Sequence, residues 1–241
     1  MSNIAIIFAG GTGTRMGAGL PKQFLQINGK PILIHTLDNF QESPEIDKIY
    51  IACKEDYIEH TKKEIEKFQI TKVAGIVPGG ATGQDSIYNA LIQAYEENPA
   101  DSIVLIHDGV RPFLTDQVIH DNIESVKKYG SAITCTPCFE TIILSPNGRK
   151  IESAPSRDEA YTAQAPQSFF LGEIVDAHKK IRKINPTYDG VVDSCTLLRK
   201  LGKEIYIVKG NRGNIKVTTP EDFYILRALL QYKENEQILG L

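Results

Sequence analysis

The order of short apolar runs and longer amphipathic stretches constrains the fold of this chain more than any other feature. The apolar runs, each about four to eight residues long, have the pattern of buried strands. They alternate with stretches whose apolar residues recur at helical spacing. This alternation predicts an α/β fold, a Rossmann-like, mostly parallel sheet with helices on both faces. The expected strands are 3–8, 46–53, 72–79, 102–109, 131–138 and 204–210, and the expected helices are 31–41, 56–68, 83–97, 115–130 (from a Thr115 cap to Gly130), 170–183, 193–202 and one from Pro220.

The alternation breaks after about residue 137. Residues 139–160 hold an apolar run, the turn signal Pro146-Asn147-Gly148 and a second short apolar stretch, which together predict a β-hairpin. No internal repeat or low-complexity segment interrupts the chain, so we expect one domain over 1–241 with a β-arm inserted at 137–160. A hairpin that leaves an α/β core often packs on another subunit, so we expect the arm to be a dimerisation element.

Composition narrows the classes of partner. The chain has 241 residues, 41% of them hydrophobic and 24% charged, and a net charge of −3. It lacks the basic footprint of a nucleic-acid binder and any apolar run of the roughly 18–20 residues that span a bilayer. The start, MSNIAIIFAGG, is typical of a strand rather than a signal peptide, and the four cysteines are too scattered for a disulfide framework. We therefore expect a cytoplasmic protein that binds neither nucleic acid nor membrane.

One pair of cysteines allows a second interpretation. Cys135 and Cys138 form a CxxC motif, which zinc and redox sites also use. The motif has no second CxxC, no nearby histidines and no thioredoxin-like setting. Small buried residues are therefore the favoured interpretation.

The loop after the first strand, AGGTGTRMG, has the composition of an anion site. Gly10, Gly11 and Gly13 can turn backbone N–H groups inward, and Arg15 and Lys22 can add positive charge, which suits a polyphosphate. The dinucleotide fingerprint fails because Met16 stands where its third glycine belongs, and the phosphate-loop motif fails because Lys22 follows proline and precedes glutamine. A glycine-rich turn with solvated charges is the plainer alternative, but two cations on so tight a turn would repel without an anion.

Several blocks resemble one enzyme superfamily, the nucleotidyltransferases that activate sugar or polyol phosphates. AGGTGTRMG followed by LPKQFL is similar to the cytidylyltransferases that act on 2-C-methyl-D-erythritol 4-phosphate or ribitol 5-phosphate. Further blocks of that family follow in order over nearly the whole chain: PGGATGQDSIYNAL, VLIHDGVRPF, APQSFF, VVDSCTLL and NIKVTTPEDF. The resemblance implies that CTP and an alcohol phosphate react to a CDP-alcohol and pyrophosphate. The nucleophile, a phosphate oxygen, is already anionic, so catalysis needs positioning and cations rather than a general base.

The resemblance also implies residue roles. It makes Arg15, Lys22 and Lys216 the catalytic cations at the α-phosphate, and Asp108 the ligand of Mg²⁺ between the phosphates. Arg111, Thr141 and Arg157 become candidate acceptor-binding residues, with Arg157 on an arm that completes the site of the other subunit in a homodimer. The residues implied to bind the nucleotide are Ala9, Gly10, Gly11, Gly13, Thr14, Gly79, Gly80, Ser86 and Asp108.

Departures from the methylerythritol pattern bear on the acceptor. Gly83 stands where those enzymes usually carry arginine, Ala165 where they often carry threonine, and Gly213 where they often carry aspartate. DGVRPF and AGGTGTRMG are also more similar to the ribitol-type enzymes. We therefore expect D-ribitol 5-phosphate as acceptor, with 2-C-methyl-D-erythritol 4-phosphate and other polyol phosphates as alternatives. Two interpretations from other classes are an NAD(P)-linked oxidoreductase and a catalytically inactive nucleotide-binding regulator.

Overall fold

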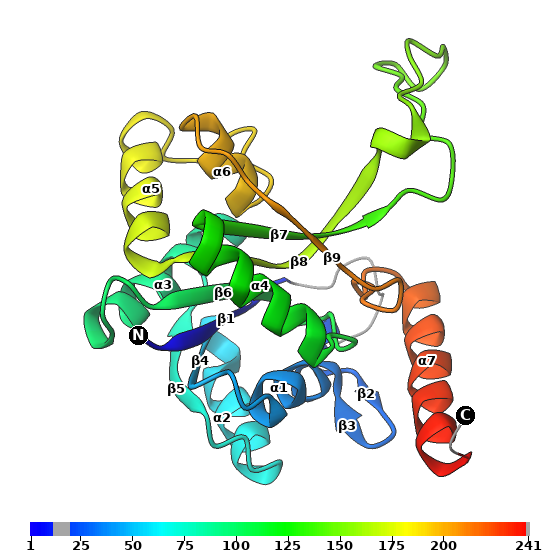
Figure 1. Ribbon diagram of the computed structural model, residues 1–241. Coiled ribbons are helices and arrows are strands. Elements are labelled where there is room, and N and C mark those ends of the chain that lie inside the picture. Colours follow the sequence, from blue (N-terminus) through cyan, green and yellow to red (C-terminus); the bar gives the residue numbers. More distant parts are fainter. Residues whose placement is uncertain (12–19, 240–241) are drawn as a thin grey trace.

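The computed structural model describes residues 1–11 and 20–239, and its elements follow the expected alternation (Figure 1). The strands are β1 (Asn3–Ala9), β2 (Gln26–Ile27), β3 (Lys30–Pro31), β4 (Lys48–Cys53), β5 (Val73–Pro78), β6 (Ile103–Asp108), β7 (Ser131–Pro137), β8 (Tyr161–Phe170) and β9 (Ile207–Lys209). The helices are α1 (Ile32–Glu42), α2 (Ile58–Lys67), α3 (Gly83–Glu97), α4 (Asp116–Tyr129), α5 (Leu171–Ile184), α6 (Ser194–Lys200) and α7 (Pro220–Leu239), with single 3-10 turns at Lys22–Phe24, Glu55–Tyr57 and Arg157–Glu159.

The central sheet has seven strands in the order β5-β4-β1-β6-β8-β7-β9. β1 lies between β4 and β6 in parallel register, so Ile6 is beside Tyr50 on one side and Ile106 on the other. β8 is antiparallel to both of its neighbours, β6 and β7, and β9 is parallel to β7. The prediction of a Rossmann-like, mostly parallel sheet is therefore confirmed.

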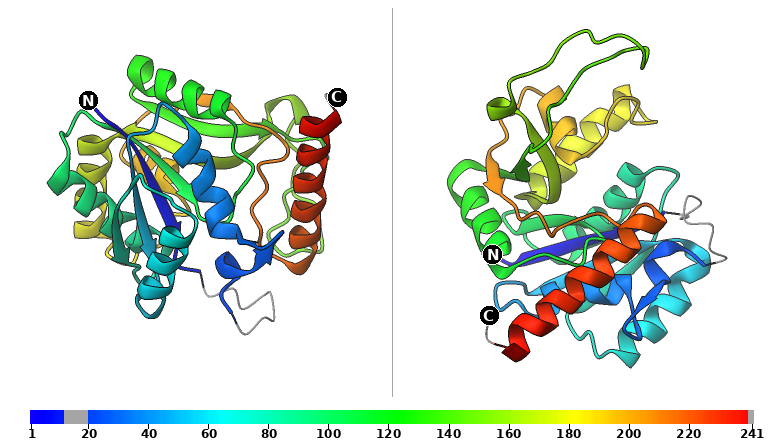
Figure 2. Two further views of the ribbon diagram at one scale, coloured as in Figure 1. Left: turned by 90° about the horizontal axis from the view of Figure 1, so that it is seen from below. Right: turned by 90° about the vertical axis from the view of Figure 1, so that its right-hand side faces the viewer.

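Helices cover both faces of this sheet because successive strand residues point to opposite sides. In β1, Ala5 and Ile7 pack in the layer formed with α1, α2 and α4, whereas Ile4 and Ile6 pack in the layer formed with α3, α5 and α6. Burying both faces explains why the central strands are apolar throughout. The left-hand view of Figure 2 shows helices on both sides of the strands.

The helix ends follow capping chemistry. Thr115 caps α4 by accepting from the Val118 amide, and the helix ends at Gly130, whose φ of 82° is left-handed, as expected. Thr82 begins α3 with a capping box, in which its side chain accepts from the Asp85 amide and the Asp85 side chain accepts from the Thr82 amide. This cap holds the turn that leads out of β5.

Two elements were not predicted. β8 was missed because glutamine, serine and proline interrupt its apolar residues, so it lacks a strand period. The β2–β3 hairpin was also missed, although its turn, Asn28-Gly29, is the strongest short-range hairpin signal. Both turn residues have positive φ, 53° and 76°, as a type I′ turn requires.

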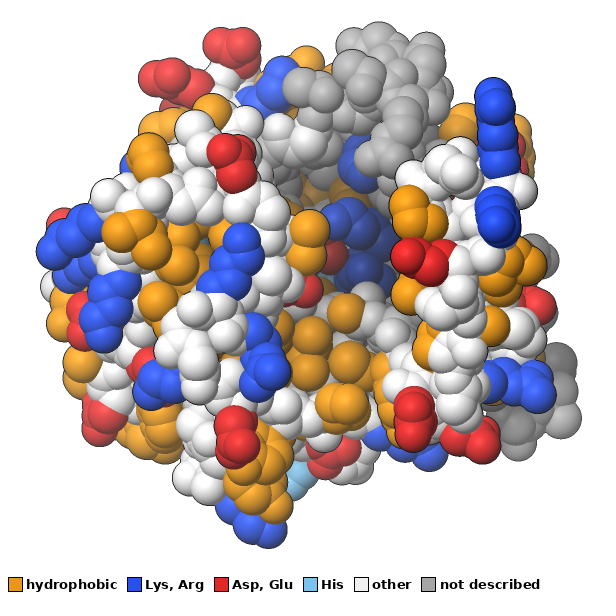
Figure 3. Space-filling model, turned by 90° about the horizontal axis from the view of Figure 1, so that it is seen from above, with side chains coloured by type: hydrophobic (Ala, Val, Ile, Leu, Met, Phe, Trp, Pro, Cys, Tyr) orange, Lys and Arg blue, Asp and Glu red, His pale blue; other side chains and the backbone are white. Residues whose placement is uncertain are grey.

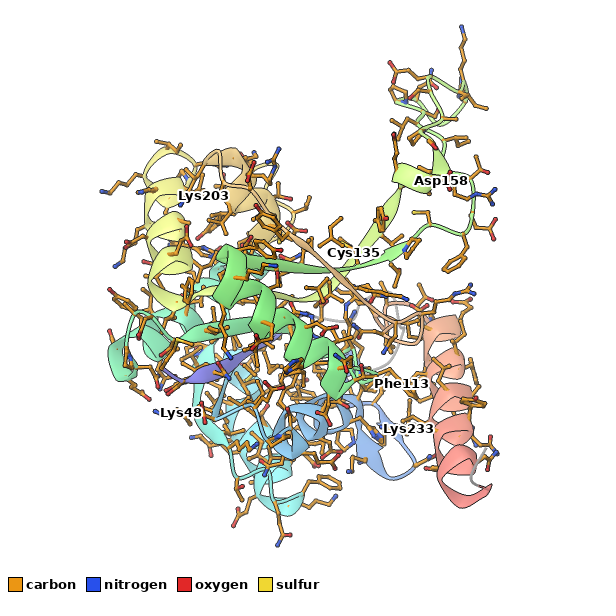
Figure 4. All side chains as sticks on the ribbon, viewed as in Figure 1. Lys48, Phe113, Cys135, Asp158, Lys203 and Lys233 are labelled. Carbon is orange, nitrogen blue, oxygen red and sulfur yellow. The ribbon has the colours of Figure 1, made fainter. Side chains whose placement is uncertain are left out.

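Residues 138–160 extend away from the sheet between β7 and β8 (Figures 1 and 2). Their strand pairing amounts to one isolated bridge, between Leu144 and Ser153, so the expected hairpin lacks regular strands. Large apolar side chains are exposed along it, including Phe139 (53%), Ile143 (53%) and Ile151 (61%). Figure 4 shows Asp158 on this arm, well beyond Cys135 on β7.

The C-terminal helix α7 packs beside the β2–β3 hairpin. Leu226 of α7 is fully buried in a small cluster with Ile27, Val110 and Val217. This contact holds the segment between β9 and α7 against the loop that follows β6.

The structure bears on two expectations from the sequence: that the cysteines are small buried residues, and that the chain has no membrane-spanning segment. Cys53, Cys135, Cys138 and Cys195 are all buried free thiols, and burial raises the pKa of Cys135 to about 11. Within residues 1–11 and 20–239, no group of three or more His, Cys, Asp or Glu side chains is arranged to hold a metal ion. No described helix is long and apolar enough to cross a membrane.

Two histidines are buried without charge. His107 bonds to the Arg111 carbonyl through Nε2 at 3.0 Å, and His178 Nδ1 bonds to the Tyr188 hydroxyl at 2.7 Å. The second ring nitrogen of each has no partner within the described chain. Burial is the main cause that lowers the pKa of His107 to about 4 and that of His178 to about 3. Both rings are therefore neutral at pH 7, in the folded state.

We predict that acidification from pH 7 to pH 5 lowers the free energy of unfolding by about 2 kcal/mol for each of these groups. The unfolded chain binds these protons near pH 6.5, and the folded chain does so only near pH 4 or below, so stability is lost as the pH falls between the two values. Urea unfolding at both pH values measures the loss. His107→Gln keeps a donor for the Arg111 carbonyl and should reduce the loss by about 2 kcal/mol; an unchanged loss would contradict a neutral buried His107.

Candidate active site

The carboxyl ends of the parallel strands open onto a cavity of about 390 Å³. One end is lined by Phe8, Asp108, Arg111 and Lys216, and the other by the start of α3, β8 and residues 187–194. Ligands bind at this edge in open α/β sheets. Figure 3 shows a hollowed face with Lys and Arg side chains in its depth.

Asp108 is the centre of the charged end. It is the last residue of β6 and is only 6% exposed. Its Oδ1 pairs with Lys216 Nζ at 2.5 Å and its Oδ2 with Arg111 Nε at 2.7 Å. Burial would raise the pKa of Asp108, but the charges of Lys216 and Arg111 outweigh it and hold this pKa below its ordinary value. The carboxylate therefore stays ionised and holds two cations.

The two cations differ in exposure. Arg111 also donates from Nη1 to the Asn214 carbonyl at 2.8 Å, and 13% of its side chain is exposed. Lys216 has 42% of its side chain exposed. Arg111 therefore clamps the loop after β6 to the segment before α7, whereas Lys216 faces solvent. Arg111, expected to bind the acceptor, is engaged mainly with protein groups.

Lys22 reaches the same point from the other end of the sequence. Its Nζ donates to the Val217 carbonyl at 2.8 Å, next to Lys216 in the chain. Gln23, which is buried, fixes the Lys22 turn to the end of β1 by donating to the Ala9 carbonyl at 2.6 Å. A side chain at Gly11 would lie 3.8 Å from Lys22 Cε, so that glycine flanks the lysine. Of the first-loop predictions, Gly13, Thr14 and Arg15 lie outside the described residues.

The loop after β5 has its shape set by Ser86. Ser86 Oγ accepts from the Gly80 amide and donates to the Thr82 carbonyl, both at 3.0 Å. A Cβ at Gly10 or Gly79 would approach this oxygen to 3.1 Å, so Ser86 packs between the loops after β1 and β5. The structure therefore brings the predicted nucleotide residues Gly10, Gly79, Gly80 and Ser86 together, with the Ser86 hydroxyl bonded within the protein.

The opposite wall of the cavity was missed from the sequence. Gln167 of β8 donates to Asp193 Oδ2 at 3.0 Å and accepts from the Cys195 amide at 3.1 Å, which fixes the start of α6. Gln84 and Ser194 are also buried at this wall and carry polar atoms without partners in the described chain. The APQSFF and VVDSCTLL blocks contain four of these five residues, all but Gln84, and the polar residues inside these blocks were the available signal.

The arm residues are not brought to this cavity. Thr141 and Arg157 are exposed and are not among its lining residues. Arg157 donates from Nη1 to the Phe139 carbonyl at 3.4 Å, at the base of the arm. The described chain therefore supplies the charged end of the cavity without the two acceptor residues expected from the arm.

Asp108 suits a magnesium ion that relies on substrate for its other ligands. Within the described part of the chain, each of its oxygens pairs with one cation, and a carboxylate oxygen can accept more than one interaction. Mg²⁺ in phosphate-transfer sites typically takes one or two carboxylates, substrate phosphates and water rather than a protein cage. The donor set therefore fits Mg²⁺ together with a triphosphate.

Comparison with known proteins identifies the family of this chain. Residues 3–232 match the family model IspD, 2-C-methyl-D-erythritol 4-phosphate cytidylyltransferase. A ribitol-5-phosphate cytidylyltransferase of Vibrio parahaemolyticus is 45% identical over 99% of this chain and 100% of its own, and a 2-C-methyl-D-erythritol 4-phosphate cytidylyltransferase of Clostridium botulinum is 40% identical over 95% and 97%. A crystal structure of 4-diphosphocytidyl-2C-methyl-D-erythritol synthase from Anaerococcus prevotii superposes with a TM-score of 0.80 at 29% identity, covering 95% of this chain and 96% of that one. The chain therefore belongs to the IspD family of cytidylyltransferases.

Proposed function

We propose that this enzyme transfers the cytidylyl group of CTP to D-ribitol 5-phosphate, giving CDP-ribitol and pyrophosphate. The observation that carries the proposal is the pairing of Lys216 with the buried carboxylate of Asp108, with Lys22 held at the carbonyl of the next residue, Val217. Family membership favours this transfer over the oxidoreductase interpretation. The presence of Lys22, Lys216 and the carboxylate of Asp108 argues against an inactive binder.

The choice of acceptor rests on the relatives. Ribitol-5-phosphate cytidylyltransferases are 44–45% identical over 99–100% of this chain, against 38–40% over 95% for the methylerythritol enzymes. The departures at Gly83, Ala165 and Gly213 support the same choice. Because the family model is described by the methylerythritol enzyme, 2-C-methyl-D-erythritol 4-phosphate is the second candidate acceptor.

The reaction is an in-line displacement. A phosphate oxygen of the acceptor bonds to the α-phosphorus of CTP, the bond to the bridging oxygen of the β-phosphate breaks, and pyrophosphate leaves with that electron pair. The acceptor phosphate has a second pKa near 6 and is largely dianionic at neutral pH, so no base has to remove a proton. The enzyme's contribution is to orient the two substrates and to stabilise charge on the phosphates.

Lys216 is the exchangeable partner of Asp108. Its side chain is more exposed than that of Arg111, which has a second anchor at the Asn214 carbonyl. We infer that Lys216 turns from Asp108 to the α-phosphate when CTP binds, while Arg111 stays on the carboxylate. Lys22, whose Nζ lies at the Val217 carbonyl next to Lys216 in the chain, would contact the same phosphates. Asp108 would then hold Mg²⁺, which, when bound, neutralises phosphate charge and orients the triphosphate.

The arm is proposed to complete the site of a second subunit. Its exposed apolar side chains, among them Ile143 and Ile151, are not buried by any described part of their own chain. Packing on a second copy would bury them, and would place Thr141 and Arg157 at the partner's acceptor end. The acceptor phosphate would thereby gain the cation that its own chain does not bring to the cavity.

We predict that pyrophosphate release from CTP is faster with D-ribitol 5-phosphate than with 2-C-methyl-D-erythritol 4-phosphate, by about tenfold or more in kcat/KM. Both acceptors are assayed in parallel with Mg²⁺, and a matched reaction contains excess chelator, which should abolish release. A preference for the methylerythritol substrate would overturn the acceptor assignment. Undiminished release in chelator would overturn the role of Mg²⁺.

Shared sites predict complementation between two inactive variants. Arg157→Ala and Lys216→Gln should each lose activity, but co-expressed chains should recover about a quarter of wild-type activity, because half of the dimers are mixed and each mixed dimer has one intact site. No recovery in the mixed population would contradict a site shared between subunits.

The double variant Ile143→Asp with Ile151→Asp should give monomers by light scattering, whereas Ile184→Asp, at an exposed position on α5, should not.

A further inference from the structure

Two segments that line the cavity are attached to one arginine outside it. The segments are the turn Thr82–Gln84, which starts α3, and the loop 185–193, which contains Tyr188. The arginine is Arg182, on the last turn of α5. It does not line the cavity, and the transfer chemistry described above makes no use of it.

The first attachment is an ion pair. Arg182 Nη1 donates to Asp85 Oδ1 at 2.6 Å. The other oxygen of Asp85 accepts from the Thr82 hydroxyl at 2.8 Å and from the Thr82 amide at 3.2 Å. Both oxygens of this carboxylate are therefore engaged, and Arg182 fixes the orientation in which it caps α3.

This attachment extends to the loop after β5, which is proposed to bind the nucleotide. The Thr82 carbonyl accepts from Ser86 Oγ, which in turn accepts from the Gly80 amide. A continuous chain of hydrogen bonds thus joins Arg182 to the loop after β5 through Asp85 and Thr82. A shift of Asp85 would change the shape of that loop.

The second attachment is aromatic. The Arg182 guanidinium carbon lies 4.6 Å from the ring centre of Tyr88 and 5.7 Å from that of Tyr188. Tyr188 is 4% exposed, has a left-handed φ of 57°, and bonds through its hydroxyl to His178. Its carbonyl accepts from the Val191 amide at 2.9 Å, so its position also sets that of Val191 in the cavity wall.

Only a planar cation can make these contacts together. A guanidinium stacks on aromatic faces while its N–H groups bind a carboxylate, whereas the ammonium of lysine is a compact point charge. Lysine at this position could keep the pair with Asp85 but would lose the stacking on the tyrosines.

We propose that Arg182 is a positioning residue of the transfer reaction. By joining Asp85 to Tyr188, it holds the turn Thr82–Gln84 and the loop 185–193 in the geometry that binds both substrates. Its effect on the acceptor rests on the proposed function. Its effect on CTP affinity does not, because the chain of contacts reaches the loop after β5 without involving the acceptor.

The test compares Arg182→Leu, Arg182→Lys and the control Lys179→Leu. Lys179 lies one turn earlier on α5, and its Nζ lies over the ring of Tyr95 of α3, 5.2 Å from the ring centre. Its loss therefore removes a cation–π contact between the same two helices, away from the cavity. Calorimetry gives the CTP dissociation constant, turnover gives kcat and both KM values, and urea unfolding gives stability. We expect Arg182→Leu to raise the CTP dissociation constant and the acceptor KM by about tenfold, Arg182→Lys by less, and Lys179→Leu to stay within about twofold.

A double-mutant cycle locates the effect. Asp85→Asn should weaken CTP binding, and its combination with Arg182→Leu should be less than additive, because both changes break the same contact. If Arg182→Leu does not fold, CTP affinity is measured in Arg182→Lys, in Asp85→Asn and in the double variant of these two. An affinity equal to that of the wild type in all three would overturn the proposal.

The outcomes separate this inference from the proposed function. If Arg182→Leu lowers stability but leaves the CTP dissociation constant and both KM values within twofold of wild type, Arg182 is merely structural and the proposal fails. If the wild type used neither acceptor, the proposed function would fail, and the CTP affinities would still decide the role of Arg182.

Discussion

Asp108 is a carboxylate that the fold buries at the carboxyl end of β6 and that two cations keep ionised. An unpaired carboxylate at this depth would be strongly unfavourable, so Arg111 and Lys216 are required as much by stability as by chemistry. Arg111 reaches the Asn214 carbonyl, and the Val217 amide bonds to the Val110 carbonyl at 3.0 Å, so the charged centre joins the loop after β6 to the segment before α7. Lys22 then closes the arrangement on the Val217 carbonyl. The site depends on this one buried charge.

The same arrangement explains how a site without a side-chain nucleophile can work. Arg111 and Lys22 are held by protein contacts before substrate arrives, and in the proposed mechanism Lys216 turns to the phosphates when CTP binds, before charge develops on them. The loops after β1 and β5, which are proposed to bind the nucleotide, are also held in place. Ser86 packs between them, and the Asp85 cap of α3 is fixed by its partner Arg182. The rigid sheet therefore supplies the cations and the nucleotide turn, and the proposed second subunit supplies the remaining acceptor contacts.

Local patterns predicted what depends on local sequence. Apolar periodicity predicted the sheet and its helices, and the Thr115 and Gly130 signals predicted both ends of α4. β8 was not predicted because its buried polar side chains form hydrogen bonds with residues distant in the sequence. For example, Ser168 Oγ donates to Asn122 Oδ1 at 2.9 Å. The family blocks predicted that Lys22, Asp108 and Lys216 belong to one site. They did not predict that Arg111 and Ser86 bind mainly protein groups, because those partners are largely backbone atoms brought close by folding. Arg182 gave no signal, since its proposed role depends on side chains of two other segments, α3 and the loop 185–193, that folding brings to it.

The most direct test of this account measures kcat for Lys216→Gln against Lys209→Gln, an exposed lysine on β9. If Lys216 leaves Asp108 to stabilise the transition state, its loss removes about 3–4 kcal/mol and lowers kcat by a factor of hundreds, with a smaller change in the KM for CTP. The Lys209 variant should retain wild-type turnover, and urea unfolding should show that both variants are folded. A folded Lys216→Gln enzyme with kcat within about threefold of wild type would contradict the central claim, because Lys216 would then serve only to neutralise Asp108.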